Sequence, residues 1–182
     1  MVRKITFCGV LSALALISFV IENLLPPLIV PGGKLGISNV FIIFAGIVLG
    51  YGYGLSALII KAVLGSIFAG NFSAILYSLT SGFIAFSLQM ALFNFSAHLS
   101  IVAISVAGGV VNSVLQGLTF CLITSTAEYV IYTPYLALLG ILGGASVGFI
   151  LFLLLKIMPE SLLSFGKTIA VGSETENAYN NK

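Results

Sequence analysis

The chain contains no aspartate and no tryptophan, and charged residues make up only 7% of its 182 residues. A soluble domain carries about a quarter charged residues. The low charge and the 59% share of hydrophobic residues therefore exclude a soluble domain and indicate an integral membrane protein. The net charge of +2 is too small to suggest a nucleic-acid partner. Without tryptophan, any aromatic belt at the membrane interfaces must come from tyrosines, and the candidates are Tyr51, Tyr53, Tyr129, Tyr132 and Tyr135.

Several kinds of chemical site are also missing. Magnesium on a substrate phosphate is held by carboxylates, and the chain has no aspartate-rich motif to supply them. It has no phosphate-binding P-loop, no HExxH motif and no nucleophile elbow. We therefore expect no catalytic residue, no metal site and no cofactor, and any ATP must be used by a partner. Cys8 and Cys121 lie in apolar segments without CxxC spacing, so we interpret them as buried apolar residues.

The remaining sequence consists of apolar segments of helix length. A helix needs about 20 apolar residues to cross a bilayer core, and the first segment meets that length, whereas the second is short and is expected to be tilted or partly buried. We predict an all-α fold, an integral membrane bundle of six transmembrane helices, over residues 5–25, 35–50, 55–69, 74–93, 101–126 and 135–157. Residues 1–159 then form one transmembrane domain, and the polar tail 160–182 is expected to be disordered.

One interruption organises this pattern. The stretch 26–39 contains three prolines and three glycines, so the preceding helix must stop there. Such backbone cannot face lipid, and we interpret residues 26–34 as an outward-facing loop that helps to close a small-molecule site. Cationic residues flank both termini and the last helix at Arg3, Lys4, Lys156 and Lys167. The positive-inside rule then predicts a plasma-membrane protein with both termini in the cytoplasm.

Charged and amide residues within this apolar frame are the candidate binding residues. Lysine at mid-bilayer is costly unless it is paired or hydrated, so Lys61 is expected in the interior rather than reaching an interface. Glu22 is either a solvated interfacial carboxylate, a partner of Lys61 or Lys34, or a ligand-binding group. Amides near membrane segments either bond neighbouring helices or contact a ligand. The candidate substrate-binding set is Glu22, Lys34, Asn39, Lys61, Asn71, Asn112 and Gln116.

Small residues recur four apart, as at Gly9 and Ala13, and at Gly140, Gly144 and Gly148. This spacing lets helix backbones approach closely in lipid. It fits packing within the bundle or docking of another membrane subunit, and Gly9 and Ala13 are the candidate docking residues.

The most specific pattern is Lys34-Leu35-Gly36-Ile37-Ser38-Asn39, accompanied by Glu22, Pro27, Lys61, Gly65, Gly70-Asn71, Val106–Asn112 and Gln116-Gly117. In these residues the chain resembles the Gx transporter family, also labelled heptaprenyl diphosphate synthase component I, over roughly residues 5–159. The resemblance implies a substrate-binding S component of an energy-coupling factor (ECF) importer. It further implies capture of a small vitamin-like or precursor molecule at the outer face. A transmembrane scaffold subunit and two cytoplasmic ATPases would then be its partners.

Two other hypotheses compete with this one. The family label suggests an accessory membrane subunit linked to polyprenyl diphosphate or quinone metabolism. The missing aspartates weigh against a prenyl-transfer site in this chain, because prenyl diphosphate synthases resemble one another in aspartate-rich motifs. The second competing hypothesis is a self-sufficient carrier. The two three-helix halves of the sequence show no clear inverted repeat to support it.

Overall fold

The computed structural model describes residues 2–24, 36–70, 72–95, 99–125 and 127–158, without the side chains of 127–129. These residues form α1 (Val2–Leu24), α2 (Asn39–Leu49), α3 (Tyr51–Phe68), α4 (Ser73–Phe95), α5 (Ile101–Thr124), the 3₁₀ helix η1 (Ala127–Tyr132) and α6 (Thr133–Ile157). Across the described ranges there is no strand, which confirms the all-α fold. The predicted loop 26–34 and tail 160–182 lie outside the described residues.

Five of the helices, α1, α3, α4, α5 and α6, are long and apolar enough to cross a membrane. The second, α2, has only 11 residues, or about 16 Å at about 1.5 Å per residue, roughly half of a bilayer core. It begins at Asn39 rather than at residue 35, because residues 36–38 form a turn. The predicted start of the third helix at residue 55 is wrong, since Tyr51 already belongs to α3 and Gly50 alone, at φ 110°, separates the two helices.

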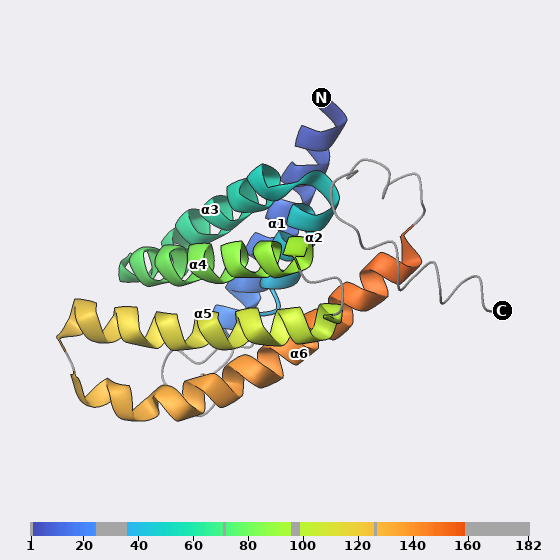
Figure 1. The fold of residues 1–182 in the computed structure, drawn as a ribbon. Helices are drawn as coiled ribbons and strands as arrows, with labels where there is room; N and C mark the ends of the chain where they lie inside the picture. Colours follow the sequence, from blue (N-terminus) through green and yellow to red (C-terminus); the bar gives the residue numbers. More distant parts are fainter. Residues whose placement is uncertain (1, 25–35, 71, 96–98, 126, 159–182) are drawn as a thin grey trace.

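The short helix α2 lies at the centre of the bundle. It packs against α1, α3, α4 and α6, and nine of its 11 residues are buried. Figure 1 shows α3, α4, α5 and α6 stacked in chain order, with α1 crossing behind them. A helix that is apolar on all sides is expected in such a buried place. The short, partly buried second segment predicted from the sequence is therefore confirmed.

Glycines bring α5 and α6 into close contact along their length (Figure 1). A Cβ atom at Gly140 would lie 2.7 Å from the carbonyl oxygen of Gly109, and one at Gly144 would lie 2.6 Å from that of Ser105. A Cβ at Gly148 would meet the Val102 Cα at 2.8 Å. For this helix pair, the small-residue spacing therefore serves packing within the bundle.

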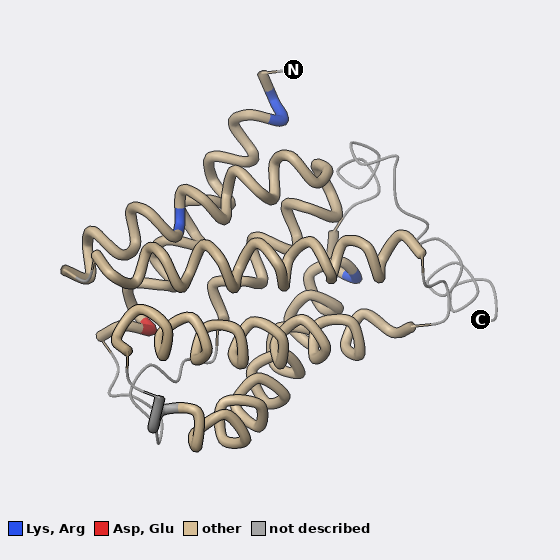
Figure 2. Tube along the Cα trace, turned by 60° about the vertical axis from the view of Figure 1, so that its left-hand side comes forward, with Lys and Arg blue, Asp and Glu red and all other residues tan. Residues whose placement is uncertain are grey.

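Charged positions are sparse along the described trace (Figure 2). Arg3 and Lys4 begin α1, Glu22 lies near its end, Lys61 is in the middle of α3, and Lys156 is in the last turn of α6. Of these described charged residues, Glu22 and Lys61 lie close to the turn that precedes α2, and both make hydrogen bonds to it.

Candidate functional site

The turn that leads into α2 is built by the Gly36-Ile37-Ser38-Asn39 part of the motif. The Asn39 N–H donates to the Gly36 carbonyl at 2.9 Å, and the Val40 N–H donates to the Ile37 carbonyl at 3.0 Å. Gly36 has φ +72°, a left-handed conformation that costs little only for glycine. The turn therefore fixes the direction in which Asn39 enters α2.

Glu22 attaches this turn to the end of α1. Its carboxylate accepts hydrogen bonds from the Ile37 N–H at 2.7 Å and from the Ser38 hydroxyl at 3.3 Å. The position is favourable for an anion, because it lies near the N-terminus of α2, where the helix dipole is positive. Glu22 thus holds the turn that precedes α2, a role that the sequence alternatives did not include.

Lys61 attaches the same turn to the middle of α3. Its side chain is 8% exposed, which places it in the interior as predicted. Its Nζ donates to the Asn39 Oδ1 at 2.9 Å and lies 5.1 Å from the centre of the Phe19 ring, within cation–π range. The Phe19 ring packs directly over Gly65, one turn along α3, where any side chain would collide with it. Gly65 therefore makes room for the aromatic ring beside the ammonium.

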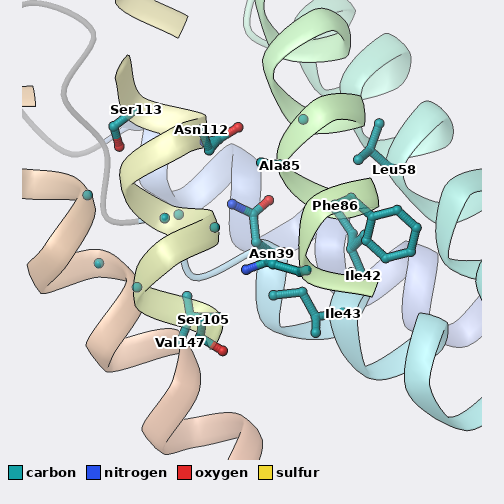
Figure 3. Close-up of a pocket in the computed structure, with 18 of the residues that line it drawn as sticks. Asn39, Ile42, Ile43, Leu58, Ala85, Phe86, Ser105, Asn112, Ser113 and Val147 are labelled. Atoms are coloured by element: carbon teal, nitrogen blue, oxygen red, sulfur yellow. The ribbon is translucent and has the colours of Figure 1, made fainter. Parts of the chain in front are cut away.

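A cavity of about 40 Å³ lies next to Asn39, between α2, α4, α5 and α6. Figure 3 shows Asn39 between α4 and α5, with Asn112 and Ser105 at different levels of α5. Its polar side chains are Asn39, Gln89, Ser105, Asn112 and Ser113. The other lining residues are glycines or apolar side chains, among them Ile42, Leu58, Phe86 and Val147. This combination offers uncharged hydrogen bonds at one part of the cavity and apolar contact at another.

Gln89 on α4 is one of three polar residues of this cavity that sequence reasoning missed, the others being Ser105 and Ser113 of α5. It is 6% exposed, and its side chain packs against Gly108 of α5, where a Cβ atom would collide with it. The neighbouring Gly109 instead faces Gly140 and Gly144 of α6. The two consecutive glycines of the motif thus have different roles, one accommodating a side chain and one a helix. The available signal was the same as for Asn112, an amide within an apolar segment.

The other predicted residues are distributed as follows. Asn39 and Asn112 line the cavity, and Lys61 lies behind Asn39. Gln116 is half-buried one turn further along α5 and is not among the described residues that line the cavity. Lys34 and Asn71 lie outside the described residues. Among the described residues, no group of three His, Cys, Asp or Glu side chains is suitably placed to hold a metal ion.

The small residues of α1 differ from those of α6. Gly9 and Ala13 are exposed, and a Cβ at Gly9 would meet nothing within 4 Å. The same side of α1 also exposes large apolar side chains, Val10 at 51% and Ile17 at 55%. This side of α1 is thus available to lipid or to another protein.

Comparison with known proteins gives one match. The family model described as heptaprenyl diphosphate synthase component I matches residues 11–154, from α1 to α6, including every described cavity residue. No curated protein and no solved structure matches the chain. With about four-fifths of its length matched, the chain belongs to the heptaprenyl diphosphate synthase component I family.

Proposed function

We propose that this membrane protein is the substrate-binding S subunit of an ECF-type importer. It captures a small molecule at the outer face of the plasma membrane, and both of its termini lie in the cytoplasm. A transmembrane scaffold and two cytoplasmic ATPases drive uptake, because this chain has no nucleotide-binding motif of its own.

The observation that carries this proposal is a polar cavity inside an otherwise apolar bundle. Polar groups at membrane depth are expensive, and they mark substrate or ion pathways when they face a shared space. Here five polar side chains from α2, α4 and α5 line one cavity. The ammonium of Lys61 donates a hydrogen bond to one of them, Asn39. A bundle that served only as a scaffold would gain stability by replacing such groups with apolar ones.

The exposed face of α1 with Gly9 and Ala13 is the proposed docking surface for the scaffold. Ala13→Leu should abolish close backbone approach and prevent co-purification with the scaffold and ATPase subunits when all are co-expressed. Ala91→Leu, at an exposed alanine of α4, is the matched control and should assemble normally. Equal assembly of the two variants, each monodisperse on its own, would contradict docking on α1.

The family description supports one alternative, an accessory subunit for polyprenyl diphosphate or quinone metabolism. The two functions differ in what the purified protein carries. Native mass spectrometry of the importer subunit should detect a small polar molecule that is lost on denaturation. A bound polyprenyl chain, or assembly with a soluble prenyltransferase instead of a membrane scaffold, would favour the alternative.

A further inference from the structure

Two buried polar side chains on the cavity wall are placed to contact a molecule in the cavity. Ser105 is 1% exposed, and no described residue hydrogen-bonds its Oγ. Gln89 is 6% exposed and lines the same cavity. Buried polar groups are rarely left without partners, because doing so is costly. The Ser105 hydroxyl, beside the Gln89 amide in one cavity, indicates that a molecule entering the cavity supplies the missing partner.

The Asn39 amide presents a donor to the same cavity. An ammonium has donors only, so the Asn39 oxygen must face Lys61 and the NH₂ group must point away from it. The Nδ2 atom lies 3.0 Å from the place where a Gly36 Cβ would be, and both residues line the cavity. The missing side chain at Gly36 therefore leaves the amide nitrogen open to a ligand.

Lys61 gives this donor a positive electrostatic environment without entering the cavity wall. An acceptor bound to Nδ2 would lie about 6 Å from the ammonium, across one amide and two hydrogen bonds. At that separation, and away from bulk water, a positive charge still discriminates strongly between anions and cations. No charged side chain is found among the described residues that line the cavity, and the ammonium of Lys61 lies directly behind Asn39.

We propose that the cavity binds a small, non-cationic molecule by a carbonyl or carboxylate oxygen, which accepts a hydrogen bond from Asn39 Nδ2. Gln89 and Ser105 bond the polar atoms beside that oxygen, and the apolar residues of α2 and α4 contact the body of the molecule. Lys61 is a positioning residue, which orients and polarises the Asn39 amide. The inference rests on the proposed function only in taking the cavity to be a small-molecule site.

A cysteine at the cavity wall makes the proposal testable without knowing the natural ligand. Ser105→Cys is placed in a chain that also carries Cys8→Ala and Cys121→Ser, reconstituted in nanodiscs. Three thiol reagents are compared: neutral methyl methanethiosulfonate, the anionic sulfonatoethyl derivative and the cationic trimethylammonioethyl derivative. Each forms a disulfide with the thiolate and releases methanesulfinate. Ala69→Cys, exposed at the end of α3, is the control position.

The ratio of anionic to cationic reaction rates at position 105 should exceed the ratio at position 69 by tenfold or more. Lys61→Met, which keeps the chain length without the charge, should reduce this preference to the control value. Asn39→Asp should do the same, because its carboxylate neutralises Lys61 by an ion pair that also preserves the attachment of α2. The second variant keeps the test decisive if Lys61→Met does not fold.

Three results would overturn the proposal. The first is that the cysteine at position 105 reacts with none of the reagents. The second is that the ratio of anionic to cationic reaction rates is equal at positions 105 and 69. The third is that the preference for the anionic reagent persists in both Lys61→Met and Asn39→Asp. None of these measurements needs a scaffold or ATPase. A failed docking experiment would therefore leave the cavity assignment standing, and a failed cavity experiment would leave the docking surface standing.

Discussion

Replacing Gly144 by alanine should separate α5 from α6 and destabilise the protein. The added Cβ would lie 2.6 Å from the Ser105 carbonyl oxygen and from the Val106 Cα, whereas ordinary contacts begin at 3.4 Å. Both neighbours are backbone atoms, so no side-chain rotation relieves the overlap and the helices must part by about 1 Å. Overpacking of this kind costs about 1–3 kcal/mol.

Gly9→Ala is the matched control, because the same methyl group meets nothing within 4 Å on the exposed side of α1. Alanine is favoured over glycine within a helix by up to about 1 kcal/mol, so this variant should be unchanged or slightly more stable. Gly144→Ala gains the same helix propensity, so the two variants should differ by the overpacking cost, about 1–3 kcal/mol in their free energy of unfolding.

Reversible unfolding by sodium dodecyl sulfate in mixed micelles, followed by circular dichroism, measures both free energies under the same conditions. Ligand binding offers a second readout, since Gly144 and Ser105 both line the cavity. A Gly144→Ala variant as stable as Gly9→Ala would refute the close approach of α5 and α6, and with it the shape of the cavity wall.

Two further predictions concern the turn before α2 and the orientation in the membrane. Gly36→Ala should lower the free energy of unfolding by about 1–2 kcal/mol, the cost of a left-handed conformation for an L-residue. Gly52→Ala, in the first turn of α3 with open space around it, should not. If the thermal melting midpoints of these two variants coincide, Gly36 is not constrained by its φ. Cysteines at Ala69 and Ser100, which flank α4 on its two sides, should react with an impermeant maleimide from opposite sides of the membrane. Labelling of both cysteines from one side would contradict a spanning α4.

The interior position of Lys61 could be predicted from sequence, because exposing a lysine to lipid at mid-bilayer has a large free-energy cost. A lysine near the middle of an apolar helix has few acceptable environments, and burial within the bundle is one of them. Its partner could not be predicted in the same way. Asn39 reaches the ammonium because Gly36 turns the chain just before α2, and such a local geometry depends on backbone angles that composition does not determine.

The fold followed from segment length and hydrophobicity, and the details of the site did not. The central position of α2 was foreseeable, since a short segment that is apolar all round must be buried. Gln89 and Asn112 are both amides in apolar helices, yet only the packing of α4 against Gly108 brings Gln89 to the cavity. Which face of a helix meets a cavity depends on helix rotation, and weak amphipathicity in a membrane segment specifies rotation poorly.

The turn at the start of α2 has a mechanical consequence. Adjacent residues, Ser38 and Asn39, are bonded to Glu22 of α1 and to Lys61 of α3. If α1 slides or rotates relative to α3, the start of α2 can move with only one of these helices, and its hydrogen bond to the other helix must break. The orientation of the Asn39 amide thus depends on the relative position of two helices, one of which carries the exposed Gly9 and Ala13 face about three turns away. By thermodynamic linkage, a protein that shifts α1 on binding changes the affinity of the cavity, and a molecule in the cavity changes the affinity for that protein by the same factor.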